Sequence, residues 1–317
     1  MSQDLVKYVL KRLLTFPVYL LIFSATVFFI AMYAPGDPVQ ILAGKGASAE
    51  VMENIRHQYG LDKPPLIQYR DYMVRFVQFD WGESLRFRGK EVIELVLERV
   101  PISAPLGFIS LVLTLTIGTT VGLTAAFRKG TRLDTILISS WLLFAAIPSL
   151  LIVQLFVFVL AIQLHWLPAG WTGGWTSAFT LTAVIPILSM SLPGVVGFAR
   201  FVRTITLGIV DQPYVMAAKA KGVPPHRRAT RYVLRNAMLP LTTVVVPALF
   251  SIIEGSFFIE KIYDIPGFAV FIVDSVFGRD YPVILSVGIF GSMLSIFVIL
   301  LVDILYRFAD PRVNIAK

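Results

Sequence analysis

Residues 211–222 read Asp-Gln-Pro-Tyr-Val-Met-Ala-Ala-Lys-Ala-Lys-Gly, a polar and basic segment between two strongly apolar blocks. Pro213 suits the first turn of a helix, where a missing N–H costs nothing, and Asp211 or Gln212 can cap that turn. Gly222 suits the left-handed position that ends a helix, and a Pro-Pro pair shortly afterwards prevents continuation. The segment therefore predicts a short helix with a sharp end, held between two membrane spans.

One face of this short helix is nearly flat. Tyr214, Ala217, Ala218 and Lys221 fall on the same side at helical spacing. Two alanines on that side allow the surface of another protein to approach closely. We therefore predict that the segment is a docking element.

The composition of the whole chain indicates a membrane protein. The 317 residues are 56% hydrophobic, with a mean hydropathy of +0.75, whereas soluble domains contain roughly 45–50% apolar residues. The net charge of +8 lies next to apolar blocks rather than in a long basic run, which favours a lipid membrane over nucleic acid as the partner. The chain has no cysteine, which excludes disulfides, thiolate chemistry and cysteine-based metal sites.

Apolar blocks long enough to cross a bilayer predict an all-α, multi-pass transmembrane bundle of six spans. The first block is longer than the core of a signal peptide, which is about 7–15 residues, so we expect a retained span. Prolines inside the blocks are compatible with helices, because packed neighbours satisfy the freed backbone groups. The blocks lie at about residues 13–34, 103–127, 134–162, 179–201, 239–259 and 282–306.

The distribution of Lys and Arg predicts how the spans are oriented. Basic residues follow the second span at 128–132, the fourth span at 200–235 and the last span at 307–317, whereas 165–178 has none. The positive-inside rule then places both termini and the 211–222 segment in the cytoplasm.

The loop between the first two spans is predicted to be a small helical domain outside the cytoplasm. Apolar residues recur at helical spacing in 51–59, 66–79 and 91–100, and Gly60 stops the first of these helices. The expected organisation is therefore a cytoplasmic N-terminus with the first span, the outer loop, a five-helix core and a cytoplasmic tail, at residues 1–34, 35–102, 103–308 and 309–317.

No arrangement of residues typical of an enzyme is present. The chain lacks a G-x-x-x-x-G-K-[ST] phosphate loop and an H-E-x-x-H zinc motif, and its three histidines fall in three separate loops. Ser256 and Ser292 have no histidine at membrane depth to act as a base. We therefore predict no catalytic and no metal-binding residues.

Two acidic residues occur in the predicted spans. Glu254 is a candidate for a solute path, because ionisable residues at membrane depth usually face a cavity or a partner; alternatively it lies near the outer surface and reaches water. Asp303 lies near the inner end of the last span, where an ion pair with a basic neighbour is the favoured interpretation.

Several motifs together resemble one family. Met216-Ala-Ala-Lys-Ala-Lys-Gly222 is similar to the E-A-A-x-x-x-G loop of permease subunits in binding-protein-dependent ABC importers, with methionine in place of glutamate. The spacing to Leu239-Pro240 resembles the branch that transports dipeptides and oligopeptides, and specifically the first permease of the pair, which has a long outer loop after its first span. Similar motifs recur along the chain as Arg235-Asn-Ala-Met-Leu-Pro240, Ala34-Pro-Gly-Asp-Pro38, Asp80-Trp-Gly-Glu-Ser84, Glu260-Lys-Ile-Tyr-Asp-Ile-Pro-Gly267, Arg279-Asp-Tyr-Pro282 and Asp303-Ile-Leu-Tyr-Arg-Phe-Ala-Asp-Pro-Arg312.

This resemblance implies a non-catalytic transport subunit in the cytoplasmic (inner) membrane of a bacterium or archaeon. It would pair with a second, homologous permease, and two ABC ATPases carrying ATP and Mg would bind below, while a solute-binding protein would dock outside. The chain itself would bind no cofactor. The coupling loop would span residues 205–240, and its contact residues would be Tyr214, Met216, Ala217, Ala218, Lys221 and Gly222.

Short peptides are the expected cargo, and two alternatives remain at this point. The same type of importer can carry chelated nickel or glutathione. An ion-driven secondary carrier is the other class, although it would be expected to show inverted repeats and charges at the midplane, and only Glu254 offers such a charge.

Overall fold

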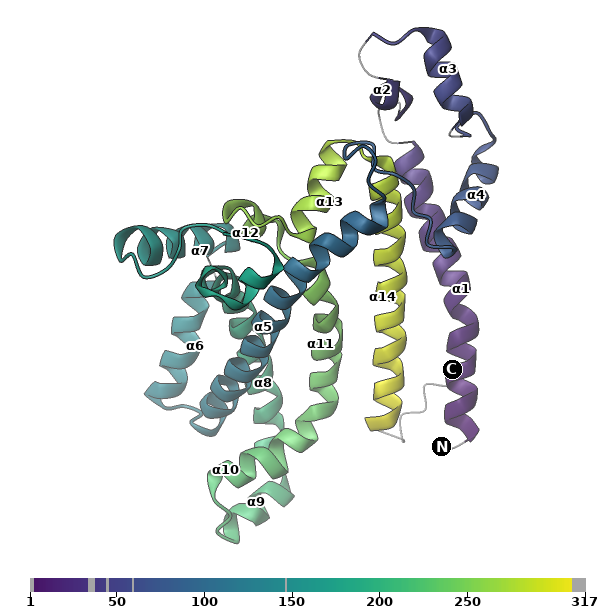
Figure 1. Ribbon diagram of the computed structural model, residues 1–317. Coiled ribbons are helices and arrows are strands. Elements are labelled where there is room, and N and C mark those ends of the chain that lie inside the picture. Colours follow the sequence, from purple (N-terminus) through teal and green to yellow (C-terminus); the bar gives the residue numbers. More distant parts are fainter. Residues whose placement is uncertain (1–2, 34–37, 44–45, 59, 146, 310–317) are drawn as a thin grey trace. The chain divides into compact units, whose positions relative to one another are not determined.

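Helices make up the regular structure of this protein (Figure 1). The computed structural model describes residues 3–33, 38–43, 46–58, 60–145 and 147–309. Among these residues no strand occurs, and Glu83 and Glu91 form an isolated antiparallel bridge. The predicted helical class is therefore confirmed.

The chain divides into two compact units. Unit 1 comprises Met1–Val100 with Phe268–Leu300, and unit 2 comprises Pro101–Gly267 with Leu301–Lys317. The helices of unit 1, two of which continue into unit 2, are α1 (Gln3–Met32), α2 (Pro38–Ala43), α3 (Ala49–Gln58), α4 (Pro65–Val77), α5 (Val92–Phe127), α13 (Phe268–Phe277) and α14 (Tyr281–Ala309).

Aromatic stacking and one buried carboxylate hold unit 1 together. The ring of Trp81 stacks on Phe76 at 5.3 Å between centroids and lies 5.6 Å from that of Phe290 on α14. Asp280, which is fully buried, accepts hydrogen bonds from Ser84 Oγ at 2.5 Å and from the Leu85 N–H at 3.1 Å. These contacts join the segment after α4 to the start of α14, although the two are about 200 positions apart in the sequence.

Unit 2 contains most of the remaining helices. These are α6 (Arg132–Ala145), α7 (Ser149–Phe156), the π-helix η1 (Val157–Gln163), the 3-10 turns η2 (Trp175–Phe179) and η3 (Leu181–Ala183), α8 (Val184–Val210), α9 (Pro213–Ala220), α10 (Pro225–Arg227), the π-helix η4 (Arg228–Leu234), α11 (Arg235–Glu254) and α12 (Phe257–Ile262).

Glycines allow the long helices of unit 2 to approach closely. A Cβ on Gly107 of α5 would lie 2.6 Å from the carbonyl oxygen of Ile252, and one on Gly122 would lie 2.5 Å from that of Ala199. Such close approach is typical of helices packed in membranes. There the hydrophobic effect does not drive helix association, and small residues allow the close van der Waals packing that does. Both glycines therefore serve helix packing.

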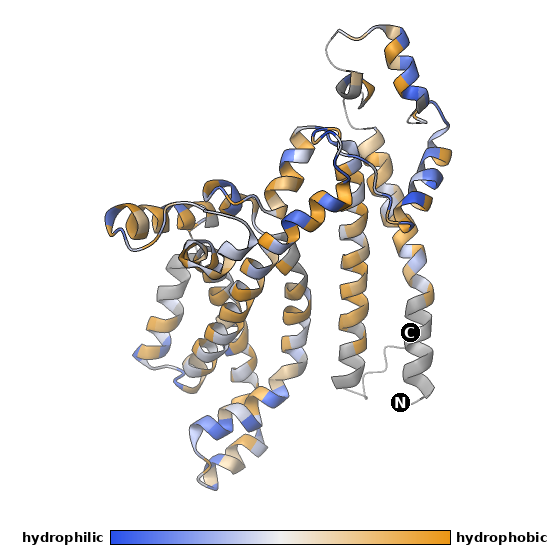
Figure 2. Ribbon diagram, viewed as in Figure 1, coloured by the Kyte–Doolittle hydropathy of each residue, from blue (hydrophilic) through white to orange (hydrophobic). Residues whose placement is uncertain are grey.

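Four described helices are long and apolar enough to cross a membrane. They are Leu14–Met32, Val92–Phe127, Leu181–Val210 and Tyr281–Val302. A fifth span results if Pro225–Met238 and Pro240–Leu249 are counted together, although they meet at a bend of 71°. Figure 2 shows how hydrophobic residues follow α14, whereas hydrophilic residues gather at α9 and α10. The described helices support a multi-pass membrane protein without confirming six spans.

Two of the predicted spans differ from the observed helices. The block at 134–162 is divided between α6 and α7, because Pro148 takes an extended conformation (ψ 140°) at the start of α7. The block at 239–259 ends as a helix at Glu254, because Gly255 adopts φ 67° and ψ −162°, a conformation that only glycine tolerates. Periodicity of apolar residues does not detect either break.

The loop after the first span is helical, as predicted. α3 and α4 correspond to two of the three expected amphipathic segments, and Gly60 takes a left-handed φ of 65° just after α3. The third segment is the beginning of α5, which continues as one helix through Pro101 and Pro105. The expected boundary at residue 102 therefore falls inside a helix.

Candidate functional site

The 211–222 segment forms the helix that its end signals predict. α9 starts at Pro213, although Gln212 at its N-cap makes no side-chain cap hydrogen bond. The helix ends where Gly222 adopts φ 75°. The N–H of Val223 then bonds back to the carbonyl of Ala218 at 3.1 Å, a closing pattern common at helix ends. The two prolines that follow begin α10, so they both end one helix and start the next.

α9 has a buried side and an exposed side. Val215 and Ala218 are 1% and 4% exposed, and α9 packs against η4 and α8. Met216 is 50% exposed and Tyr214 is 42% exposed. Ala217, Lys221 and Gly222 are also exposed.

The exposed face of α9 therefore differs from the predicted one. Ala218 lies on the inner side, so its small size serves packing within the helical hairpin of residues 211–240 rather than contact with a partner. Met216 and Ala217 occupy the outer side, together with Ala220. Tyr214 precedes Ala217 by three residues and Lys221 follows it by four. Because an α-helix turns about 100° per residue, both lie beside Ala217 at the edge of this surface.

The base of the hairpin is an apolar cluster shared by α8 and α11. Phe198 and Val202 of α8 pack with Ala237 and Leu241 of α11, and all four are nearly inaccessible. Partly buried side chains of α5 pack against this cluster. α9 is therefore attached to two long helices through a packed base and not through flexible linkers.

An ion pair holds the neighbouring turn to α8. Arg203 donates two hydrogen bonds to Asp134, each 2.8 Å long, and Asp134 also accepts the N–H of Gly130 at 3.1 Å. Asp134 is 5% exposed, so the carboxylate of this bidentate ion pair is largely removed from solvent. The guanidinium of Arg228 lies 5.9 Å from the ring centroid of Phe127, the last residue of α5. The first of these contacts joins α6 to α8, and the second joins η4 to the end of α5.

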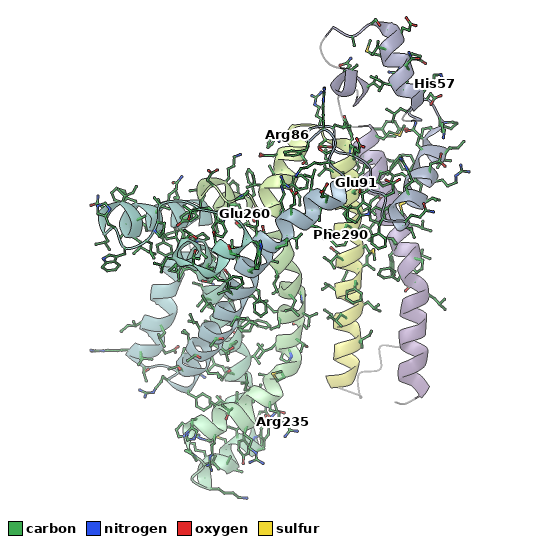
Figure 3. The ribbon with its side chains drawn as sticks, viewed as in Figure 1. His57, Arg86, Glu91, Arg235, Glu260 and Phe290 are labelled. Atoms are coloured by element: carbon green, nitrogen blue, oxygen red, sulfur yellow. The ribbon has the colours of Figure 1, made fainter. Side chains whose placement is uncertain are left out.

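The hairpin surface is strongly basic. Figure 3 labels Arg235 at the junction of η4 and α11. The other exposed basic residues of this region are Lys219, Lys221, Arg227 and Arg231. Such a surface suits anionic lipid headgroups or an acidic protein partner.

The other residues singled out from the sequence do not form a second site. Glu254 is the last residue of α11, but its side chain lies outside the described part of the structure, as does that of Asp303. Ser292 donates to the carbonyl of Gly288 within its own helix at 2.8 Å. Within the described residues no group of three or more His, Asp or Glu side chains is arranged to hold a metal ion.

The structure shows that Glu260, like Asp280, is a buried acid in the stretch between the fifth and sixth predicted spans. Glu260 on α12 is 2% exposed and accepts a hydrogen bond from Ser103 Oγ at 2.8 Å (Figure 3). Gly267 lies directly against it, because a Cβ there would be 2.5 Å from the Glu260 carboxyl carbon. The only signal in the sequence was Gly267 itself, because a glycine after Ile-Pro can mark a close approach.

Comparisons with known proteins agree with this architecture. Residues 118–315 match the family described as binding-protein-dependent transport system inner membrane component, and residues 5–106 match the N-terminal component of the same system. The chain is 33% identical over 310 residues to the oligopeptide transport system permease protein OppB of Haemophilus influenzae, covering 98% of this chain and 100% of that protein.

Two further relatives show similar coverage. The OppB protein of Escherichia coli is 32% identical over 310 residues, which are 98% of this chain and 100% of that protein. The dipeptide transport system permease protein DppB of Bacillus subtilis is 32% identical over 311 residues, which are 98% of this chain and 99% of that protein. The family expected from the motifs is thereby confirmed. The chain belongs to the binding-protein-dependent transport system inner membrane components, as a multi-pass transport subunit and not an enzyme.

Proposed function

We propose that this chain is one of two permease subunits that together form the ATP-driven pathway of a peptide importer. The names and near-complete coverage of its relatives support short peptides as cargo over chelated nickel or glutathione. A second homologous permease, two ABC ATPases that bind ATP and Mg, and a solute-binding protein complete the assembly. Both termini and the hairpin face the cytoplasm, the 35–102 loop faces outward, and Glu254 contributes to the pathway.

The observation that carries the coupling role is the construction of α9. Its inner side chains, Val215 and Ala218, are packed within the hairpin, whereas Met216 and Ala217 have no covering on the outer side. A surface of this kind accepts an ATPase without rearranging its own base. The eight residues of α9 form a rod of about 12 Å.

The hairpin transmits movement because its base is a tightly packed apolar cluster. When the ATPases close on ATP, they push on α9, and the apolar cluster between α8 and α11 passes the displacement to both helices. The Asp134–Arg203 pair keeps α6 moving together with α8. The transport path then switches between its inward-facing and outward-facing states.

Replacing Ala217 by Trp tests this role. The bulky indole on the outer side of α9 prevents close approach of the ATPase without entering the packed side. We expect transport by the assembled importer in proteoliposomes to fall at least tenfold, while membrane insertion and assembly of the two permeases are retained. Ala169→Trp is the matched control, because Ala169 is also exposed but lies in the loop between η1 and η2. Unchanged transport and ATP hydrolysis by Ala217→Trp would exclude α9 as the coupling element.

The cargo is tested separately, through the binding protein that co-purifies with this subunit. We expect its bound molecule, identified by mass spectrometry, to be a short peptide. A bound nickel chelate or glutathione would contradict peptide transport and leave the coupling role intact. Uptake by the purified single chain under a proton or sodium gradient would instead indicate a secondary carrier.

A further inference from the structure

Helix α4 carries a surface that the transport cycle described above does not use. Tyr72 and Phe76 form its inner side and are 9% and 7% exposed, whereas Val74 and Val77 on other sides are 53% and 69% exposed. The turn that follows presents Phe79, which is 69% exposed. In an aqueous loop, such side chains would normally face the interior of the protein or the surface of a partner.

Hydrogen bonds fix the level at which α4 lies along the spanning helices of unit 1. The hydroxyl of Tyr69 is 2.7 Å from Ser24 Oγ and donates to the carbonyl of Leu21 at 3.2 Å. Ser24 is eight residues before Met32, where the apolar span of α1 ends. At 1.5 Å per residue, the contact lies about 12 Å inside that end.

A second set of contacts gives the same level on α14. The hydroxyl of Tyr72 lies 2.6 Å from Ser286 Oγ. Ser286 is five residues beyond Tyr281, the start of that span, or about 8 Å along the helix. Ser286 also donates to the carbonyl of Trp81 at 3.2 Å, and the Trp81 ring contacts Phe290, deeper still (Figure 3).

These levels fall within the hydrocarbon region if α1 and α14 span the membrane. Half of that region is about 15 Å thick. α4 and the segment up to Trp81 therefore run beside the spans at the depth of acyl chains, not above the membrane surface. The exposed side chains of α1 at this level, Leu21 and Ile22, are apolar as well, at 53% and 56% exposure.

The charged residues of α4 share a cavity-facing side of the helix. Arg70 pairs with Asp71 at 2.7 Å, and Lys63 reaches the same carboxylate at 3.1 Å, while Arg75 lies in the last turn of the helix. Arg70, Asp71 and Arg75 line an open cavity of about 1110 Å³, and Val74 lines it too, whereas Val77 and Phe79 are not among its lining residues. Long basic side chains at a membrane boundary keep their charged ends in water.

Phe79 adds an independent sign that the apolar side has an occupant. Its φ is 62°, a left-handed conformation that costs a bulky residue on the order of 1–2 kcal/mol. This conformation directs a large aromatic side chain outward at the end of α4. An exposed phenyl ring held in this way is stabilised when it enters an apolar medium.

We propose that α4 and the turn at Phe79 are embedded in the bilayer leaflet that contains the Met32 end of α1, with lipid acyl chains covering Val77 and Phe79. The outer loop would then be anchored in the membrane along the helix that precedes its Trp81 segment. This arrangement gives the unit a fixed height at the membrane and does not depend on which cargo is carried.

Spin labels at single cysteines test the proposal. Because this chain contains no cysteine of its own, each variant has one labelling site in this subunit. Val77→Cys and Phe79→Cys are labelled in the full importer reconstituted in lipid nanodiscs. We expect the ratio of collision with oxygen to collision with a water-soluble nickel chelate to be several-fold higher at these positions than at Glu53→Cys. Glu53 is the control because it is an exposed residue of α3 in the same loop.

Two outcomes would overturn the proposal. Labels that collide mainly with the nickel chelate would show an aqueous surface, open to the binding protein. Labels that collide with neither reagent would show that another protein subunit covers this side. The second measurement attaches the fluorophore bimane to Phe79→Cys. We expect lipids with brominated acyl chains to reduce its fluorescence, and unchanged fluorescence would show that acyl chains do not touch the turn.

Discussion

Gly267 lies so close to Glu260 and Ser103 that no side chain fits at its position. A Cβ would be 2.5 Å from Glu260 Oε2 and 2.5 Å from Ser103 Oγ, and both partners are buried. The hydrogen bond from Ser103 contributes to compensating for burial of the Glu260 carboxylate, since an unpaired polar group in this environment is costly. The glycine thus preserves the bond between α5 and α12.

We therefore expect Gly267→Ala to destabilise the protein by about 1–3 kcal/mol, the usual cost of overpacking. The measurement is the thermal unfolding of the detergent-solubilised subunit, followed by tryptophan fluorescence. Gly208→Ala is the matched control, because nothing lies within 4 Å of a Cβ there and α8 gains a better helix former. Equal melting temperatures for the two variants would contradict the close packing at Gly267.

At the scale of one element, α9 depends on how it ends. Gly222 has φ 75° and open space around its Cβ, so a substitution there is opposed by backbone conformation and not by a neighbour. The left-handed turn closes the helix through the Val223–Ala218 hydrogen bond and directs the chain into α10. A residue that rejects this conformation would lengthen or unravel α9 without disturbing its packed side directly.

Gly222→Val and Gly222→Asn separate conformation from side-chain size. Valine disfavours the left-handed region strongly, whereas asparagine tolerates it. We expect Val to lower transport per ATP hydrolysed by several-fold and Asn to retain most of it, in proteoliposomes that contain the complete importer. Similar losses for both variants would mean that the glycine is needed for contact, and not for ending the helix.

At the scale of the whole molecule, the basic residues predict which segments face the cytoplasm. Single cysteines at Lys129 and Lys219 are expected to react with a membrane-impermeant maleimide only after permeabilisation, because Lys and Arg are enriched in cytoplasmic loops. Ser48→Cys and Thr172→Cys are expected to react in intact cells, since both lie in segments that are predicted to face outward. All four positions are exposed. Labelling of Lys129→Cys in intact cells would reverse the proposed orientation.

Helical breaks are the part of the fold that apolar periodicity did not predict. The interruption at Pro148 and the turn at Gly255 depend on backbone conformations at single residues. Proline within an apolar block is compatible with either outcome, as α5 shows by continuing through Pro101 and Pro105. Which outcome occurs depends on whether neighbouring helices satisfy the freed carbonyl groups, and those neighbours come from distant parts of the chain.

The sequence by itself determined the class of protein, the helical loop after the first span, and the start and end of α9, because each depends on composition or on residues within a turn or two of one another. Only the tertiary structure decided that Ala218 faces inward, that Ser103 pairs with Glu260 from 157 positions away, and that Tyr69 reaches Ser24 from 45 positions away. Burial and hydrogen bonding of this kind depend on which helices meet and at what height. The local spacing of residues along a chain does not determine which helices pack together, since many arrangements of the same helices are compatible with the same spacing.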